Sequence, residues 1–513
     1  MPWTRHNIRV SFAPVARILA GFATFFSLAQ LVPLIYALFE PAPPRPEVVP
    51  IAGFTASIAI GITAALLLWL GGRGKGTQLF RREGIAVVGL SWLLASVLGA
   101  IPYVWSGAIP GAVDAVFETV SGLTTTGASV LGTGENMKIE EMPESILLWR
   151  SLTHWLGGLG IVLVFVILLP AMGITGKSLI ASEQTGIASD GFQPRMIEQG
   201  RLLFRVYLAL TLVCTVVLAL GCGMSWFDAV NHAFATIATG GFSTKNASIA
   251  AFDSIGVEVV LTLFMFIAGC NFGLLANAAQ KGPRVLWKDT ELRAYLAATL
   301  LLVGAATVTL MLDGRPLLGS LRAAGFNVVS VFTSTGFATE DFQKWSLPTL
   351  MLMLGSMAVG ACTGSTCGGM KLVRFVVVLK LLGYTIRHYL RPKSVERIKL
   401  GGQTLNPNVI SDILAIVLMW IVGIFVGAFV IALDTRLPFL SSLSTSASML
   451  GCCGPAICDV DSMGRALGPD LGPMGGFGEL HAPTKVFLSF LMVLGRLEFL
   501  APIALLSRTF WRR

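Results

Sequence analysis

The sequence predicts an all-α, polytopic membrane protein, and three observations support this class. Of the 513 residues, 54% are hydrophobic and only 13% are charged, whereas about 25% of the residues of a typical soluble domain are charged. Ten apolar stretches are long enough for a membrane helix, which needs about 20 predominantly apolar residues. Four shorter apolar segments, each ending in a turn that contains glycine, lie between the later stretches. The chain therefore consists of two N-terminal spans and four units with the order span, half-length helix, turn, span.

The predicted spans follow one another with short connections. They cover residues 18–39, 50–70, 84–104, 147–170, 200–222, 254–280, 292–312, 346–382, 408–433 and 481–508. The first span is too long for the core of a secretory signal peptide, so we expect it to be retained. The proline-rich stretch 41–50 predicts an extended connector. We expect a two-helix unit over residues 1–83 and repeats over 84–170, 171–280, 281–382 and 383–513.

The four short segments share one pattern. They are FETVSGLTTTGAS (117–129), NHAFATIATGGFS (231–243), FNVVSVFTSTGFAT (326–339) and STSASMLGCCGPA (444–456). Each contains a corresponding glycine, at Gly127, Gly241, Gly336 and Gly454. The sixth residue before that glycine is small in each segment: Ser121, Ala235, Ser330 and Ser448. The ninth is polar: Glu118, His232, Asn327 and Thr445. A feature that occurs four times in one chain can close a ring around one axis.

The chemistry of such turns favours a cation. A helix that ends inside a membrane leaves its last carbonyl groups unpaired, and that end carries partial negative charge. Glycine allows the next residues to turn their carbonyl groups toward an axis, and nearby hydroxyl groups can hydrogen-bond to this backbone. Rings of backbone carbonyls select small cations in membrane proteins. One such turn alone would be read as an ordinary helix C-cap, and the fourfold occurrence favours the ring.

The charge distribution predicts the orientation. The net charge of +9 would suggest nucleic acid as the partner of a soluble protein, but here the basic residues lie mostly in short loops, including residues 5–9, 73–82, 281–288 and 387–399. Basic loops stay in the cytoplasm, so we expect both termini inside, the four turns toward the outside, and no nucleic acid partner. The opposite loops are acidic and would raise the local cation concentration, although acidic loops can equally be ordinary solvated loops.

Other classes of protein find no support in the sequence. The eight cysteines show no Cys/His spacing for a metal site. An intramembrane enzyme would need a Ser/His dyad, an HExxH motif or paired aspartates, and none is found, so we do not expect an enzyme. A carrier with alternating access and discontinuous helices is the closer rival.

Further motifs carry a resemblance to a known family. They are SGLTTTGAS with RSLTHWLGGLGIVLVFVILLPAMG (150–173), FMFIAGCNFGLL (264–275), TSTGF, ACTGSTCGGMKLVR (361–374) and GRLEFLAP (495–502). With them the chain resembles the Trk/Ktr/HKT potassium transporter superfamily, most closely its bacterial TrkH-type membrane subunits. The resemblance implies four non-identical membrane–pore-helix–membrane units around a single pore in the bacterial inner membrane.

The resemblance also assigns a K⁺ filter. Its residues are Thr124, Thr125, Thr126 and Gly127; Ala238, Thr239, Gly240 and Gly241; Thr333, Ser334, Thr335 and Gly336; and Gly451, Cys452, Cys453 and Gly454. In plant relatives a serine at the first glycine goes with sodium transport, so four glycines resemble a potassium filter. A Na⁺-permeable filter, or a Na⁺- or H⁺-coupled carrier of the same family, remains the alternative. The fourth stretch departs from the family in its GCCGPA, and Cys458 could pair with one of these cysteines.

Two elements are candidates for a gate. Small and polar residues interrupt the eighth predicted span: Gly360, Gly364, Ser365, Thr366, Gly368 and Gly369. Irregular backbone at membrane depth must be buried in protein or line a water-filled cavity. The resemblance implies a flexible loop below the filter, with a kinked, packed helix as the alternative. Arg496 lies within the last span, where a charge indicates function; the resemblance places it in the pore as a barrier to cations, and an ion pair with Glu498 or Glu118 is the alternative.

The expected partners follow from the same resemblance. They are the transported K⁺, a second copy of the chain in a homodimer, membrane lipid, and a cytoplasmic TrkA-type nucleotide-binding ring. The chain has no nucleotide-binding motif of its own, and we expect no organic cofactor. The basic stretch 387–399 is a candidate docking site for the ring.

Overall fold

The computed structural model describes residues 12–41, 45–73, 81–133, 136–172, 192–392, 397–434, 436–461 and 465–512. The predicted basic stretch 5–9 and parts of the stretches 73–82 and 387–399 lie outside these residues. The regular secondary structure of the described residues is helical apart from two short paired strands, β1 (Lys399–Leu400) and β2 (Gln403–Thr404), and an isolated bridge between Val460 and Ala466. The predicted all-α membrane class is therefore confirmed, with this small hairpin as an addition.

The helices follow the predicted order. The N-terminal unit holds α1 (Phe12–Ala29), α2 (Leu31–Ala37) and α3 (Pro50–Gly71). The next stretch holds α4 (Arg81–Ser106), α5 (Ala112–Leu123) and α6 (Glu144–Met172). Then come α8 (Phe192–Val216), extended by a π-helical turn (Val217–Gly221), α9 (Trp226–Ile237), α10 (Ile255–Ala268), α11 (Phe272–Lys281) and α12 (Arg284–Lys288).

The second half repeats this order. It holds α13 (Thr290–Leu312), α14 (Leu317–Phe332), α15 (Leu347–Val359) and α16 (Leu372–Leu390), then α17 (Pro407–Ala432), α18 (Phe439–Gly451), α19 (Ala482–Arg496), α20 (Leu500–Leu506) and α21 (Arg508–Arg512). Single 3-10 turns lie at Ile139–Glu141, Ser248–Phe252 and Phe342–Lys344. The short helices α5, α9, α14 and α18 thus each follow a long helix.

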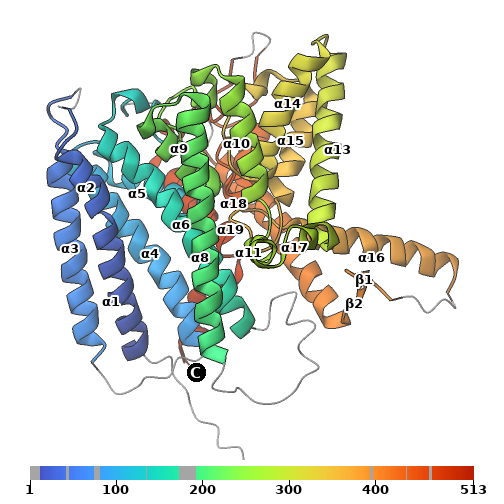
Figure 1. The fold of residues 1–513 in the computed structure, drawn as a ribbon, viewed down its shortest axis with the longest axis horizontal. Coiled ribbons are helices and arrows are strands. Elements are labelled where there is room, and N and C mark those ends of the chain that lie inside the picture. Colours follow the sequence, from blue (N-terminus) through green and yellow to red (C-terminus); the bar gives the residue numbers. More distant parts are fainter. Residues whose placement is uncertain are drawn as a thin grey trace, which may run out of the picture.

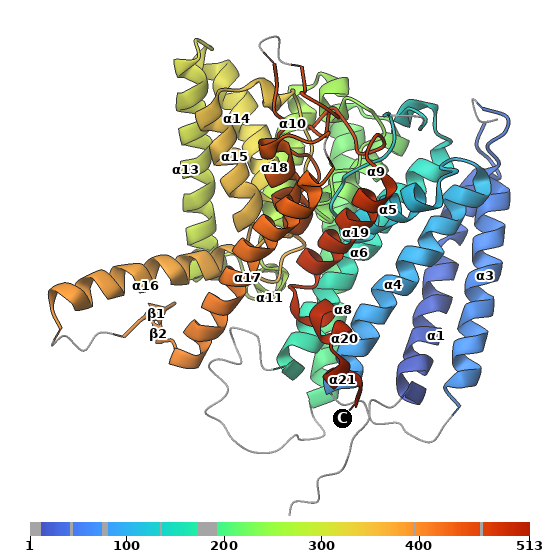
Figure 2. The ribbon, with the colours of Figure 1, turned by 180° about the vertical axis from the view of Figure 1, so that it is seen from behind.

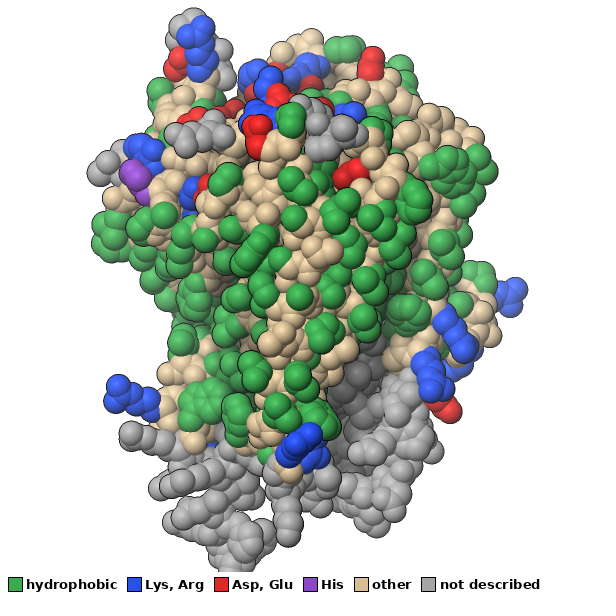
Figure 3. Space-filling model, turned by 90° about the vertical axis from the view of Figure 1, so that its left-hand side faces the viewer, with side chains coloured by type: hydrophobic (Ala, Val, Ile, Leu, Met, Phe, Trp, Pro, Cys, Tyr) green, Lys and Arg blue, Asp and Glu red, His purple; other side chains and the backbone are tan. Residues whose placement is uncertain are grey.

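The surface fits a membrane environment. Among the described residues, six helices are long and apolar enough to cross a membrane, or seven if the bent pair α10 and α11 is one span. Figure 3 shows hydrophobic side chains over the middle of one face, while most of the acidic side chains on this face lie at its upper end, intermixed with basic ones. The short helices lie in the upper half of the molecule (Figures 1 and 2), nearer that end.

Three of the four second helices are broken. The chain bends by 96° between α10 and α11, and residues 360–371 separate α15 from α16 without helix. Between α19 and α20, Glu498 and Phe499 have φ of +53° and +65°, which breaks the helix. The sequence predicted only the second of these interruptions.

The eighth predicted span differs from the structure beyond its interruption. The sequence predicts that residues 346–382 form one membrane span. Instead α16 leaves the body sideways (Figures 1 and 2), and its apolar side chains, such as Leu382 and Ile386, are exposed. Since α16 makes few contacts with the helix bundle, its hydrophobicity alone could not reveal its direction.

Two glycines on the second helices allow close contact with the short helices. A Cβ atom at Gly157 of α6 would lie 1.8 Å from the carbonyl oxygen of Leu123, the last residue of α5. A Cβ atom at Gly495 of α19 would lie 1.9 Å from the corresponding oxygen of Leu450 in α18. Both oxygens belong to the fourth residue before a repeated glycine, so the two contacts are equivalent.

We expect Gly157→Ala to destabilise the protein. The added methyl group cannot fit without moving α6 away from α5, and such overpacking typically costs about 1–3 kcal/mol. The control is Gly160→Ala on the same helix, where a Cβ atom would meet none of the described residues within 4 Å. Thermal unfolding in detergent should show a lower midpoint for Gly157→Ala only, and equal midpoints for both variants would contradict the packing argument.

Candidate ion-conducting site

The four turns have the same backbone conformation. The residue two positions before each glycine has a positive φ: Thr125 (55°), Thr239 (53°), Ser334 (52°) and Cys452 (51°). The glycines follow with φ of 81° at Gly127, 80° at Gly241, 82° at Gly336 and 96° at Gly454. Left-handed backbone is uncommon for residues other than glycine, and it persists only where the surroundings impose it. Four repeats of it indicate that the surroundings are the same each time.

Each short helix ends in the same hydrogen bond. The N–H group before each glycine donates to the carbonyl of the small sixth residue: Thr126 to Ser121 (2.9 Å), Gly240 to Ala235 (2.7 Å), Thr335 to Ser330 (2.8 Å) and Cys453 to Ser448 (2.9 Å). This is the long bond of a Schellman motif, which caps the C-terminus of a helix. The local structure is therefore a helix cap, as the simpler interpretation of a single turn proposed, and the arrangement of the four caps is what differs from an ordinary cap.

The four turns meet one another in cyclic order. A Cβ atom at Gly127 would lie 2.0 Å from the carbonyl oxygen of Gly240, and one at Gly241 would lie 1.9 Å from that of Thr335. A Cβ atom at Gly336 would lie 2.2 Å from the oxygen of Cys453, and one at Gly454 would lie 2.6 Å from that of Thr126. Each glycine thus faces the carbonyl that precedes the glycine of the next repeat. The last contact returns to the first repeat and closes a ring.

The ring alternates in its side chains. Hydroxyl groups pair in the first turn, Thr124 with Thr126 at 2.7 Å, and in the third, Thr333 with Thr335 at 2.8 Å. The corresponding positions are Ala238 and Gly240 in the second turn and Gly451 and Cys453 in the fourth. The four turns therefore share their backbone but not their side chains.

His154 of α6 fills the space beside Gly240. A Cβ atom at Gly240 would lie 2.5 Å from its ring. The Nε2 atom accepts the N–H of Phe242 at 3.2 Å, so Nδ1 carries the proton that is donated to the carbonyl of Gly122 at 2.7 Å. His154 therefore joins the first short helix to the second turn. From the sequence it could not be distinguished from a packing residue.

The polar ninth residues hold the segments that leave the turns. Val130 N–H donates to Glu118 Oε2 at 2.9 Å, His232 Nε2 lies 3.0 Å from Ser243 Oγ, and Thr339 N–H donates to Asn327 Oδ1 at 3.2 Å. The fourth repeat differs, since the Thr445 hydroxyl has no hydrogen-bond partner among the described residues. The preceding residue replaces it: Ser444 Oγ accepts the N–H of Ile457 at 2.9 Å.

The cysteines of the fourth turn are buried and unpaired. Cys452, Cys453 and Cys458 are free thiols in the structure. Cys458 Sγ accepts the N–H of Leu471 at 3.3 Å, whereas Cys452 Sγ and Cys453 Sγ each lie 3.6 Å from a different carbonyl oxygen, of Met492 and Val331. The alternative of a disulfide with Cys458 is therefore wrong for this structure.

The loop 360–371 packs directly against three of the turns. Gly368 N–H donates to Ser334 Oγ at 2.7 Å, and a Cβ atom at Gly368 would lie 2.1 Å from the carbonyl oxygen of Gly451. Thr366 Oγ1 donates to the carbonyl of Ile237 at 3.0 Å and lies 3.3 Å from Thr239 Oγ1. The loop contains no helix, and Gly360, Gly364 and Gly369 have φ of 71°, 73° and 80°. The alternative of a kinked helix is therefore wrong.

The same loop is joined to the break between α10 and α11. Cys362 N–H donates to the carbonyl of Gly269 at 3.1 Å, and Phe272 N–H donates to that of Gly364 at 3.0 Å. Asn271 Nδ2 donates to the carbonyl of Thr363 at 2.7 Å. The breaks in two repeats thus satisfy each other's backbone groups, as irregular structure within a membrane protein must.

Arg496 lies at the same level as the loop. Its side chain is buried, and Nη1 donates to the carbonyl of Thr366 at 2.6 Å. Its Nε and Nη2 atoms have no hydrogen-bond partner among the described residues. Glu498 pairs with Arg374 at 2.5 Å and Glu118 with Arg150 at 2.7 Å, so neither carboxylate forms the alternative ion pair with Arg496.

The fold and the ring together define a class of protein. A multi-pass helical membrane protein with four short helices, whose capped ends close one ring of contacts between glycines and carbonyl groups, has the arrangement expected of a cation transport protein and not of an enzyme. The family model of TrkH, described as a cation transport protein, matches residues 51–510. The chain belongs to the TrkH family.

Individual relatives agree with this membership over nearly the whole chain. The Trk system potassium uptake protein TrkH of Salmonella typhimurium is 32% identical over 508 residues, which are 98% of this chain and 99% of the relative. Its counterpart in Vibrio parahaemolyticus is 33% identical over 513 residues, which are 98% of this chain and 100% of the relative. The crystal structure of the potassium transporter TrkH from Vibrio parahaemolyticus superposes with a TM-score of 0.85 at 31% identity. The match covers 98% of this chain and 100% of that structure's chain. The resemblance noted in the sequence is confirmed.

Proposed function

We propose that this protein takes up K⁺ into a bacterial cell through the ring formed by its four turns. The observation that carries the proposal is the cyclic contact of Gly127, Gly241, Gly336 and Gly454 with carbonyl groups of the neighbouring repeats. Relatives that cover the chain are named potassium uptake proteins. Backbone carbonyls can replace the hydration shell of K⁺ without a charged side chain.

The filter of this proposal consists of the four stretches 124–127, 238–241, 333–336 and 451–454. The two hydroxyl pairs in the first and third stretches support the backbone from the side. The thiols of the fourth stretch do not coordinate the ion; Cys453 Sγ lies 3.6 Å from the carbonyl of Val331, away from a ring of backbone oxygens. The two cysteines by which the fourth stretch differs from the family sequence therefore leave the ring of backbone oxygens intact.

The gate of this proposal is the loop 360–371 together with Arg496. The loop lies against the turns and obstructs the path below them, and the guanidinium opposes a cation that arrives there. A cytoplasmic TrkA-type nucleotide-binding ring would move the loop, docking on basic residues such as Arg387 and Arg391 at the end of α16. The functional unit is a homodimer within membrane lipid.

The proposed orientation places the turns outside. The acidic side chains at the upper end of Figure 3 lie near the entrance, where they raise the local cation concentration. Both termini are cytoplasmic, in the inner membrane, because the basic loops stay on the side of synthesis.

The test is rescue of a bacterium that lacks its own K⁺ uptake systems. Expression of the chain should restore growth at low K⁺, and ⁸⁶Rb⁺ uptake into the cells should rise with it. A protein that reaches the membrane but restores neither growth nor uptake would contradict the proposal. Competition by Na⁺ tests the alternative of a Na⁺-permeable filter. If Na⁺ is taken up as well as K⁺, the protein is a general pathway for monovalent cations and not a K⁺-selective one.

A further inference from the structure

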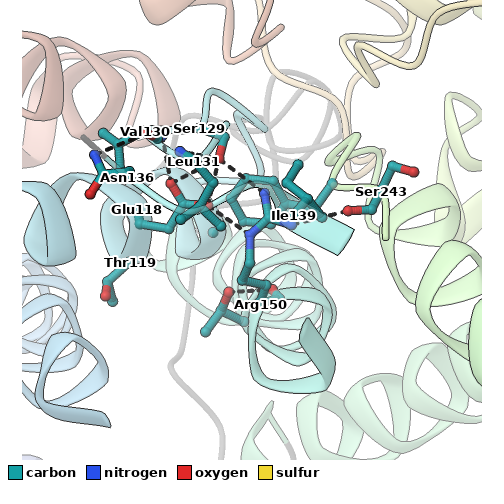
Figure 4. Close-up of polar contacts among 12 residues, drawn as sticks. Glu118, Thr119, Ser129, Val130, Leu131, Asn136, Ile139, Arg150 and Ser243 are labelled. Carbon is teal, nitrogen blue, oxygen red and sulfur yellow. Dashed lines mark hydrogen bonds and ion pairs between the residues drawn. The ribbon is translucent and has the colours of Figure 1, made fainter. Parts of the chain in front are cut away.

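A buried ion pair lies beside the first turn (Figure 4). Arg150 Nε of α6 lies 2.7 Å from Glu118 Oε1 of α5, and the side chains are 2% and 0% exposed. The guanidinium carbon lies 3.9 Å from the centre of the Phe242 ring, and Phe242 directly follows Gly241. The pair therefore lies within the wall that surrounds the ring of turns.

The other two nitrogen atoms of Arg150 reach the segments that leave two different turns. Nη2 donates to Ser129 Oγ at 3.2 Å, and Nη1 donates to the carbonyl of Ser243 at 3.0 Å. Ser129 and Ser243 are equivalent residues, because each lies two positions after its glycine. Glu118 completes the set by accepting the Ser129 hydroxyl at 2.9 Å. One side chain thus connects the same point of two neighbouring repeats.

The corresponding supports in the other repeats are neutral and shorter in reach. His232 and Asn327 contact the segments of their own repeats, at Ser243 and Thr339. In the fourth repeat Ser444 contacts Ile457 of its own segment. Among the described residues at these positions, only Glu118 takes part in an ion pair, and only its partner extends into a second repeat.

We propose that the Glu118–Arg150 pair determines the ion specificity of the ring, with Arg150 as a positioning residue that fixes the first turn against the second. The inference rests on the proposed function. Carbonyl rings discriminate between ions by cavity size or by the number and field of their ligands, and both depend on how closely the repeats approach. The three acceptors of Arg150 lie in different directions, which suits a planar, forked donor and not an ammonium group.

The decisive variant is Arg150→Lys, which keeps a positive charge beside Glu118 but cannot reach all three acceptors. In proteoliposomes with ion-sensitive dyes, we expect K⁺ uptake to persist and the ratio of K⁺ to Na⁺ uptake to fall about tenfold, roughly the value of one charge-assisted hydrogen bond. Ser129→Ala removes the acceptor of Nη2, together with the hydrogen bonds of the Ser129 hydroxyl to Glu118 and to Leu131 N–H, and leaves Arg150 in place. We expect Ser129→Ala to lower the ratio of K⁺ to Na⁺ uptake by less than Arg150→Lys does. This variant also tests the inference if the lysine variant fails to fold.

The control for the change of a paired arginine to lysine is Arg322→Lys, whose side chain is 44% exposed where that of Arg150 is 2% exposed. Arg322 of α14 makes a forked ion pair with Glu258 of α10, with both nitrogen–oxygen distances at 2.7 Å, but it lies near the start of its short helix, away from the turns. Its uptake ratio should equal that of the wild type. An unchanged ratio in folded Arg150→Lys and Ser129→Ala would overturn the inference and leave the proposed function standing. A wild-type protein that transports neither ion would instead overturn the proposed function, and the inference with it.

Discussion

Replacing Gly336 by serine is expected to abolish K⁺ uptake by a protein that still reaches the membrane. A Cβ atom at this position would lie 2.2 Å from the carbonyl oxygen of Cys453 and 2.9 Å from Pro455 Cδ, and φ is +82°. Both neighbours belong to the fourth turn, so the junction between the third and fourth turns must open. The positive φ costs roughly 1–2 kcal/mol for a residue with a Cβ atom, and the overpacking about 1–3 kcal/mol more. Growth at low K⁺ and ⁸⁶Rb⁺ uptake measure the loss.

The short helix that leads into this turn, α14, offers the control. A Cβ atom at Gly325 of α14 would meet no described residue within 4 Å, so Gly325→Ser should support growth like the wild type. The ring also predicts a graded series, because a Cβ atom at Gly454 would meet its nearest carbonyl at 2.6 Å and one at Gly241 at 1.9 Å. Gly454→Ser should therefore retain more uptake than Gly241→Ser. Normal uptake by membrane-inserted Gly336→Ser would show that the ring is not the ion path.

The four turns could be anticipated from the sequence because the same short pattern occurs in every repeat. Each turn needs a small residue at the sixth position, whose carbonyl accepts the capping N–H, and a glycine where the backbone approaches the next repeat. Both requirements recur at fixed spacing, as in Ser121 with Gly127 and Ser330 with Gly336. The polar ninth residue also has a local role in the first three repeats, where it bonds to the segment that leaves its own turn.

The features that the sequence did not reveal depend on contacts between distant repeats. Arg150 and His154 occupy their positions because of Ser243 and Gly240, about ninety residues away. The break at Phe499 has no glycine to indicate it, and its backbone is set by the packing around it. The direction of α16 depends on the loop before it, whose hydrogen bonds go to α10, α11 and the second and third turns. No periodicity within a single segment carries this information.

Replacing Arg496 by alanine is expected to increase cation flux. The guanidinium is buried below the turns, where one nitrogen holds the loop at the carbonyl of Thr366 and two others have no hydrogen-bond partner among the described residues. A unit positive charge 4 Å from a cation opposes it by about 4 kcal/mol at an effective dielectric constant of 20. Removing the charge and the bond to the loop should lower both parts of the barrier, so we expect ⁸⁶Rb⁺ flux into proteoliposomes to rise by at least about tenfold.

Two further variants separate the charge from the hydrogen bond. Arg496→Lys keeps the positive charge, so its flux should stay near that of the wild type if electrostatics dominates. Arg496→Gln removes the charge and leaves only a shorter amide donor, so its flux should approach that of Arg496→Ala. Arg508→Ala, which removes an exposed arginine of α21, controls for the loss of positive charge as such and should change nothing. If the alanine variant is folded and its flux is unchanged or lower than that of the wild type, Arg496 is not a barrier. If the flux of the lysine variant rises to that of the alanine variant while that of the glutamine variant does not, the arginine closes the pore by holding the loop and not by its charge.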